Sequence, residues 1–205
     1  RRRLGIEVKE GYGLTECSPV VTNALGTDAP TGSVGIPVPG LEVRLVDTDG
    51  SDVLIGDSGE LWVRGPNVFS GYLDDAEATA RALTDDGWLR TGDLAVVDDK
   101  GFLYLVDRVK DLIIVSGFNV FPAEVEEVLI EHPRIDAVAV VGVPHPHSGE
   151  AVKAYVVVGE GAIEEDDVVA FCAEYLPTYK CPTKVVFVDE IPRGLGGKVL
   201  RRALR

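Results

Sequence analysis

The chain has 205 residues, of which 45% are hydrophobic, and carries a formal net charge of −14. This length allows one large domain or two modest ones, each able to bury a core. The negative charge repels polyanions at long range and argues against broad nucleic-acid binding. No run of eighteen apolar residues occurs, so the sequence predicts no transmembrane segment.

The cysteines indicate a reducing environment. Cys17, Cys172 and Cys181 are odd in number and far apart, a pattern that fits neither a disulfide framework nor a Cys-x-x-Cys metal site. A cytoplasmic location is the simplest interpretation. Cys172 falls on the apolar face of a predicted helix, where packing is its expected role.

The first half of the chain reads as β-rich. Alternating polar and apolar residues from Glu42 to Arg64, interrupted by turn signals such as Asp49-Gly50, predict short antiparallel strands. Further strands are predicted at Trp88 to Val97 and at Phe102 to Val106. Between them, Asp74 to Leu83 is rich in Ala and Glu and predicts a helix.

After Asp107 the pattern changes to strand, helix, strand, strand, helix, strand, helix. The predicted strands include Leu112 to Val115 and Ala137 to Val143. Pro122 suits the first position of a helix, where its missing N–H leaves no hydrogen bond unmade. The sequence therefore predicts a domain boundary near Asp107 to Lys110 and an α+β domain beyond it.

The segment Gly-Tyr-Gly-Leu-Thr-Glu has features of a nucleotide site. Gly11 and Gly13 would let the backbone approach a ligand closely, and Tyr12 offers a flat face for a purine. Thr15 supplies a hydroxyl for phosphate and Glu16 a carboxylate for a divalent cation. On these grounds alone an ordinary turn remains the alternative.

Two further positions carry chemistry. Asp93, in Thr-Gly-Asp, could accept hydrogen bonds from both hydroxyls of a ribose. Lys198 lies in the glycine-rich segment Pro192 to Arg202, from which its charge could neutralise negative charge that develops in a reaction. Taken singly, each is better explained as a solvent-facing surface residue.

In their order and spacing, these motifs resemble those of the adenylate-forming superfamily, and the intervening sequence resembles bacterial long-chain fatty-acid–CoA ligases over essentially the whole chain. The resemblance implies an α+β fold. Residues 1–107 would form the end of the large domain, including a β-rich, distorted barrel-like subdomain. Residues 108–205 would form a small mobile C-terminal domain with a short central sheet and flanking helices.

The resemblance also implies a two-step reaction. A fatty acid and ATP would give acyl-AMP and pyrophosphate, and coenzyme A would then give acyl-CoA and AMP, with Mg²⁺ as the metal. Tyr12 would stack on adenine, Thr15 would contact the α-phosphate and Glu16 would coordinate magnesium. Asp93 would hold the ribose with the help of Arg108.

The same resemblance assigns four positions after the boundary. Lys110 would be the hinge between the two half-reactions, as expected of an exposed residue that absorbs backbone rotation. Gly117 would line the pantetheine tunnel and Asn119 would lie near the nucleotide. Lys198 would be the adenylation lysine, within Pro-x-x-x-x-Gly-Lys-x-x-Arg.

Two positions depart from the family pattern. Arg90 stands where many bacterial ligases carry histidine, so no role is transferred to it. Gly194 stands where relatives usually have serine or threonine, which predicts a less ordered or more slowly engaging loop around Lys198.

The chain begins close to its nucleotide motif, and the family's Ser/Thr/Gly-rich phosphate loop does not precede it. We therefore expect a C-terminal fragment that is inactive by itself. Two alternatives stay open: an enzyme that passes acyl-AMP to a carrier protein, and a non-catalytic binding module. The expected partners are small molecules; acyl chain length, aryl acids, oligomeric state and peripheral membrane contact also stay open.

Overall fold

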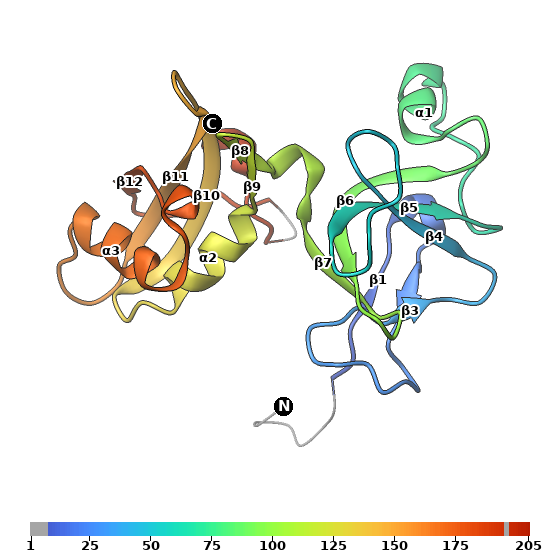
Figure 1. The fold of residues 1–205 in the computed structure, drawn as a ribbon, viewed down its shortest axis with the longest axis horizontal. Helices are drawn as coiled ribbons and strands as arrows, with labels where there is room; N and C mark the ends of the chain where they lie inside the picture. The colour runs from blue at the N-terminus through green and yellow to red at the C-terminus, as the bar shows by residue number, and fades with distance from the viewer. Residues whose placement is uncertain (1–7, 195–196) are drawn as a thin grey trace. The chain divides into compact units, whose positions relative to one another are not determined.

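The computed structural model describes residues 8–194 and 197–205. The chain divides into two compact units, Arg1–Val109 and Lys110–Arg205. In the described part, twelve strands form three sheets and three α-helices are present, which confirms the predicted α+β class (Figure 1). No helix of this part is long and apolar enough to cross a lipid bilayer.

The first unit contains a small antiparallel sheet and a larger one. The small sheet has the order β1-β2-β3, with β1 at Gly11–Tyr12, β2 at Thr22–Asn23 and β3 at Ile36–Pro37. The larger sheet is a meander in chain order, because each strand pairs with the next. Its strands are β4 (Glu42–Val46), β5 (Ser58–Arg64), β6 (Leu89–Val97) and β7 (Leu103–Arg108).

One hydrophobic core serves this unit. Leu61 and Val63 of β5 are fully buried beside Leu89 and Leu103, and Val21 joins them from the chain next to β2. The alternation of buried and half-buried residues along β5 is the period of two that the sequence predicts. The two sheets do not close into a barrel in the described residues.

The predicted helix of the first unit forms as α1, Ala76–Ala82. It begins where it does because the Asp75 side chain accepts a hydrogen bond of 2.8 Å from the Ala78 N–H and thereby caps the first turn. Glu77 and Arg81 form an ion pair one turn apart on its exposed surface.

The second unit is built on a mixed five-stranded sheet. Its main path is β10-β11-β8-β9, and β12 pairs in parallel with β11. The strands are β8 (Ile113–Val115), β9 (Phe118–Val120), β10 (Ile135–His145), β11 (Gly149–Val158) and β12 (Lys184–Phe187). Two α-helices accompany them, α2 (Pro122–Ile130) and α3 (Glu165–Tyr175).

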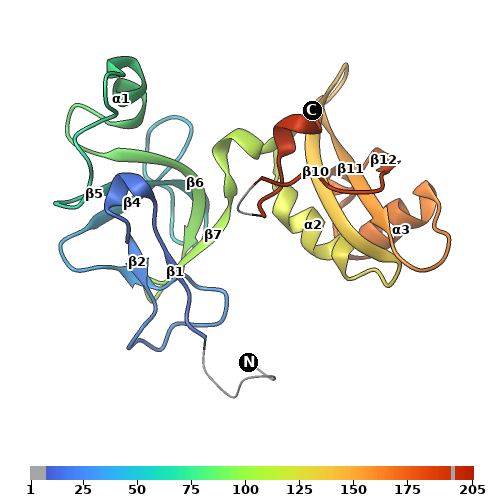
Figure 2. The same cartoon turned by 180° about the vertical axis from the view of Figure 1, so that it is seen from behind.

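Successive residues of β10 face opposite sides of this sheet. Val138 and Val140 pack with α2 and α3 in the main core, which also contains Cys172. Ala139 and Val141 pack on the other side with Leu204 of the C-terminal segment. The two views of the ribbon show both helices on one side of β10 and β11 (Figures 1 and 2).

The predicted order of elements needs two corrections in this unit. Strand β9, which is only three residues long and forms a hairpin with β8, was not predicted. The predicted final helix is a single 3-10 turn, Arg201–Ala203. Pro122 is the first residue of α2, as predicted.

Candidate functional site

Asp93 lies in an irregularity between β5 and β6. Glu60 pairs with Leu94 and Trp62 pairs with Arg90. Between these pairs, the single residue Leu61 of β5 lies opposite three residues of β6, Thr91 to Asp93. The Thr91 hydroxyl donates to the Leu61 carbonyl at 2.7 Å and accepts from the Asp93 N–H at 3.1 Å. The Gly92 N–H donates to Glu60 Oε1 at 3.0 Å. Such a bulge re-aims a side chain, and here it fixes the direction of the Asp93 carboxylate.

The Asp93 carboxylate joins two other predicted site residues. Its Oδ2 accepts a hydrogen bond of 2.6 Å from the Tyr12 hydroxyl, and its Oδ1 lies 3.1 Å from Arg108 Nε. The Asp93 side chain is 14% exposed and the Arg108 side chain 50%. Burial, followed by the hydrogen bond to Asp93, raises the pKa of the Tyr12 phenol far above its usual value, so this group is a proton donor at every physiological pH.

The backbone around Tyr12 is tightly enclosed. A Cβ on Gly13 would lie 1.8 Å from the Pro19 carbonyl oxygen, which excludes any other residue without a backbone shift. The buried Thr22 hydroxyl accepts from the Tyr12 N–H at 3.2 Å and donates to the Val34 carbonyl at 2.7 Å. A cavity of about 450 Å³ is lined by residues that include Gly11, Tyr12 and Gly13. This cavity borders the predicted nucleotide motif, whereas Asp93 and Arg108 are not among its lining residues.

Glu16 lies on the short 3-10 helix Thr15–Cys17. Its Oε1 accepts a hydrogen bond of 2.8 Å from the Tyr72 hydroxyl, and its carbonyl accepts one of 2.8 Å from the Phe69 N–H. The Phe69 and Tyr72 rings meet edge to face at 4.8 Å. Thr15 is exposed. Tyr72 therefore orients the Glu16 carboxylate, while Thr15 is accessible to solvent.

The described residues contain no group of three or more His, Cys, Asp and Glu side chains arranged to hold a metal ion. This does not conflict with a magnesium role for Glu16, because Mg²⁺ is commonly bound by one or two carboxylates together with phosphates of a substrate. Glu16 fits such a role because its Oε2 has no hydrogen bond to any residue that the structure describes.

The three cysteines are free and buried. Burial raises the pKa of Cys17 to about 11 and that of Cys172 to about 12. Both thiols therefore stay protonated at neutral pH and lack the thiolate that nucleophilic chemistry requires. Cys17, although it follows Glu16 directly, is part of the hydrophobic core.

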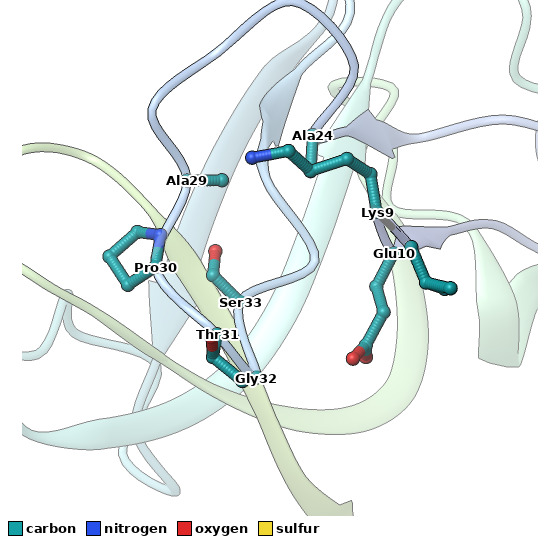
Figure 3. A pocket seen from close by; sticks show the side chains of 9 residues that line it. Lys9, Glu10, Ala24, Ala29, Pro30, Thr31, Gly32 and Ser33 are labelled. Atoms are coloured by element: carbon teal, nitrogen blue, oxygen red, sulfur yellow. The ribbon is translucent and has the colours of Figure 1, made fainter. Parts of the chain in front are cut away.

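A second pocket of the first unit adjoins the cavity at the nucleotide motif, with which it shares the lining residues Lys9 and Glu10. It has a volume of about 180 Å³ and is lined by the chain before β1 and by the loop that follows Ala24. Figure 3 shows the Lys9 side chain extending past Ala24 toward Ala29. The Lys9 ammonium donates to the Thr27 carbonyl at 3.2 Å. None of the predicted site residues lines this pocket.

Arg90 packs on the outside of the larger sheet. Its guanidinium lies 5.1 Å from the Trp62 ring centroid, and Arg44 lies 5.9 Å from the same centroid. The three residues are neighbours across β4, β5 and β6. Arg90 also donates to the Arg81 carbonyl at 3.2 Å. These cation–π contacts account for an arginine at this position without a role at Asp93.

In the second unit, Gly117 and Asn119 belong to the β8–β9 hairpin. Ser116 and Gly117 both have positive φ, 52° and 84°, as a two-residue turn of the mirror-image type requires. Asn119 is exposed in the middle of β9. The neighbouring Phe118 ring stacks on Tyr179 with centroids 4.8 Å apart. Gly117 is therefore the second residue of a tight hairpin turn.

Lys110 lies in the 3-10 turn Val109–Asp111, at the start of the second unit. Its side chain is exposed, and its carbonyl accepts a hydrogen bond of 3.0 Å from Arg205 Nη2. The next residue, Asp111, is buried and pairs with Arg205 at 3.1 Å. The predicted hinge is thus tied to the C-terminal end of the chain.

Lys198 lies on one leg of a hairpin near the C-terminus. Arg193 and Val199 form an isolated antiparallel bridge, and the Gly194 N–H donates to the Lys198 carbonyl at 2.9 Å. The Lys198 side chain is exposed and forms no hydrogen bond or ion pair with the described residues. The loop prediction also covers residues 195 and 196, which lie outside the described part.

Comparison with known proteins agrees with these motifs. Residues 1–73 match the AMP-binding enzyme family, and residues 124–198 match the AMP-binding enzyme C-terminal domain. The chain belongs to the AMP-binding enzymes. Members of this family include the long-chain-fatty-acid–CoA ligase of Yersinia pestis, which is 52% identical over 98% of this chain and 36% of its own length. The chain therefore spans about a third of the length of these curated relatives.

Other AMP-binding enzymes are also similar. The 4-coumarate–CoA ligase-like 4 of Oryza sativa is 41% identical over 97% of this chain and 37% of its own length. The ATP-bound structure of MatB from Rhodopseudomonas palustris is 41% identical with a TM-score of 0.90, covering 98% of this chain and 40% of that one. The o-succinylbenzoate CoA synthetase of Bacillus subtilis was solved with its acyl-adenylate intermediate. It is 34% identical with a TM-score of 0.84, covering 96% of this chain and 40% of that one.

Three supporting residues of this member of the AMP-binding enzyme family were not predicted. Glu60 holds the turn before Asp93, Tyr72 orients Glu16, and Arg201 pairs with Asp111 and Glu126. Only Arg201 had a signal in the sequence, because it is the arginine of the Gly-Lys-x-x-Arg motif. The other two act through contacts between segments distant in sequence, which no local pattern marks.

Proposed function

We propose that the protein carrying this chain is an acid–thiol ligase that forms fatty acyl-CoA from a long-chain fatty acid, ATP and coenzyme A. The long-chain-fatty-acid–CoA ligases among the relatives support the substrate class. In the first step a carboxylate oxygen attacks the α-phosphorus of ATP, and the bond to pyrophosphate breaks. In the second step the coenzyme A sulfur attacks the acyl carbon, AMP leaves and the thiol proton passes to solvent.

The observation that carries this proposal is the cluster of Tyr12, Asp93 and Arg108. A partly buried carboxylate held between a phenol and a guanidinium is suited to accept both ribose hydroxyls of a nucleotide. The Tyr12 ring offers a stacking face for adenine. Gly11 and Gly13 allow the close backbone contacts beside it, because an added Cβ would lie 3.1 Å from the Thr22 carbonyl oxygen and 1.8 Å from that of Pro19.

Thr15 and Glu16 are proposed to serve the phosphates. The exposed Thr15 hydroxyl would contact the α-phosphate, and Glu16 would hold Mg²⁺ together with phosphate oxygens. When bound, the ion would neutralise phosphate charge. The contribution of the chain is the orientation of the Glu16 carboxylate by the Tyr72 hydroxyl.

Lys198 is proposed as the catalytic residue of the first step. Its exposed ammonium has no partner among the described residues, so it is free to pair with the negative charge that develops between carboxylate and α-phosphate. A lysine is suited to this role because it is a compact point charge on a flexible stem.

The second step is proposed to use the second unit. Residues 1–107 would end the large domain, and residues 108–205 would rotate about Lys110 as a mobile domain between the two half-reactions. Gly117 would then line the path of pantetheine, with Asn119 near the nucleotide. The tight turn at Ser116 and Gly117, with no side chain on Gly117, is consistent with a close approach of ligand to backbone.

A product assay tests the proposed function. The protein carrying this chain is incubated with ATP, Mg²⁺, coenzyme A and a panel of fatty and aryl acids, and acyl-CoA is separated from acyl-AMP. We expect acyl-CoA from long-chain acids. Acyl-AMP without acyl-CoA would indicate a carrier-protein acceptor instead, and the absence of both products would contradict the ligase assignment. The three free thiols support a reducing, cytoplasmic location for this activity.

A further inference from the structure

An ion pair covers the edge of the central sheet in the second unit. β10 lies at one end of the strand order. The Val140 N–H donates to Glu126 Oε1 at 2.8 Å, and the Val140 carbonyl accepts from Arg201 Nε at 3.3 Å. Arg201 Nη2 also lies 2.8 and 2.7 Å from the two Glu126 oxygens. The pair therefore occupies the place that a neighbouring strand would otherwise take.

The same guanidinium reaches Asp111, the residue that follows the predicted hinge Lys110. Arg201 Nη1 lies 3.7 Å from Asp111 Oδ2, and Arg205 Nη2 lies 3.1 Å from Asp111 Oδ1. Only 9% of the Asp111 side chain and 18% of the Arg201 side chain are exposed. One arginine thus links the residue after Lys110 to helix α2 and to strand β10.

Arg201 is also three residues from Lys198. The hairpin that carries Lys198 is closed by hydrogen bonds from Gly194 N–H to the Lys198 carbonyl at 2.9 Å and from Leu200 N–H to the Pro192 carbonyl at 2.8 Å. Because the Lys198 side chain has no described partner of its own, the position of the lysine depends on the anchorage of its backbone. Arg201 is the first charged residue after Lys198, and its side chain contacts Glu126, Asp111 and the Val140 carbonyl.

We propose that Arg201 is a positioning residue for Lys198. It holds the hairpin that carries Lys198 and the Asp111 carboxylate, next to the hinge, in one fixed arrangement. Rotation about Lys110 would then move Lys198 together with the rest of the second unit. The inference rests on the proposed function, since it presumes that Lys198 acts in adenylation. Lysine cannot replace Arg201, because it lacks the planar fork that contacts Glu126 and the Val140 carbonyl together.

The first test separates the two half-reactions in the protein that carries this chain. We expect Arg201→Lys to slow acyl-adenylate formation by about a hundredfold, the effect of displacing a catalytic group by roughly 1 Å. Thioester formation from preformed acyl-adenylate should change less than threefold. The matched control is Arg202→Gln, because Arg202 is exposed and no hydrogen bond or ion pair joins its side chain to the described residues. Equal losses in both half-reactions, or no loss in either, would overturn the positioning role.

The second test needs no catalysis. Amide hydrogen exchange at Gly194 and Leu200, which close the hairpin, should become at least tenfold faster in Arg201→Gln and in Glu126→Gln but not in Arg202→Gln. If the unsubstituted protein forms no acyl-adenylate, the proposed function fails and this measurement alone decides the anchoring. Unchanged exchange in Arg201→Gln would reject the anchoring role whatever the activity.

Discussion

The hydroxyl of Tyr12 donates a hydrogen bond of 2.6 Å to Asp93 Oδ2, although 81 positions separate the two residues. The bond joins β1 of the small sheet to β6 of the larger one. It places the flat face that could stack on a purine beside the carboxylate that could hold a ribose. The two parts of a nucleoside would therefore be recognised by groups that orient each other.

Tyr12→Phe tests this relationship, because it keeps the ring and removes the hydroxyl. A hydrogen bond to a charged group contributes about 1.5–3 kcal/mol, so we expect AMP to bind roughly tenfold more weakly in titration calorimetry. The control is Tyr104→Phe, which removes another tyrosine hydroxyl bonded to an aspartate, Asp98, at 3.2 Å. If Tyr12→Phe and Tyr104→Phe bound AMP with equal affinity, the role assigned to the Tyr12 hydroxyl would be wrong.

The raised pKa of Tyr12 predicts a loss of stability in alkali. The unfolded chain releases this phenolic proton near its ordinary pKa of 10.0, whereas the folded protein retains it. Above pH 10 the folded state therefore binds more protons, and the free energy of unfolding falls as pH rises. The free energy of unfolding, measured by urea denaturation at pH 8 to 11, should fall less steeply in Tyr12→Phe than in the unsubstituted protein. If the free energy of unfolding fell equally with pH in both proteins, the buried hydrogen bond of Tyr12 would not account for the loss of stability.

Gly13→Ala should strongly destabilise the first unit. The added Cβ would lie 1.8 Å from the Pro19 carbonyl oxygen and 2.8 Å from its carbon, and such overpacking costs about 3 kcal/mol. A suitable control is Gly194→Ser, since a Cβ there meets only ordinary contacts from 3.5 Å and should change stability by about 0.5 kcal/mol or less. Urea denaturation compares the two variants. A stable Gly13→Ala protein would show that the chain can relax around Pro19.

Lys198→Ala should reduce acyl-adenylate formation by about a hundredfold or more, because the variant removes charge stabilisation from the transition state. The exposed side chain has no described partner, so thermal stability should be unchanged. Lys184→Ala provides the control, as this lysine is exposed on β12. Pyrophosphate release measures the step, and an unaltered rate in Lys198→Ala would remove this residue from the mechanism.

Local patterns in the sequence predicted much of the fold. Pro122 indicated the start of α2, and the alternation along β5 indicated one buried face. The β9 strand was missed because its three residues are too short for a periodic signal. The predicted C-terminal helix is a single 3-10 turn, although its basic residues have good helix propensity. There the arginine contacts with Asp111 and Glu126 determine the local structure.

The candidate site was less predictable. Its residues Tyr12, Asp93 and Arg108 came from separate motifs, and only their order suggested that they act together. The hydrogen bonds that join them depend on the bulge at Thr91 and Gly92 and on pairing between distant strands. Such long-range geometry has no local sequence signal, which is also why Glu60 and Tyr72 were not found.

The most direct test of the central claim follows the oxygen of the acid. A long-chain fatty acid labelled with ¹⁸O in its carboxylate is incubated with ATP, Mg²⁺, coenzyme A and the protein carrying this chain, and the products are examined by mass spectrometry. Attack of the carboxylate on the α-phosphorus predicts AMP that carries one ¹⁸O atom beside the acyl-CoA. Label in inorganic phosphate with formation of ADP would indicate an acyl-phosphate route and would contradict adenylate chemistry.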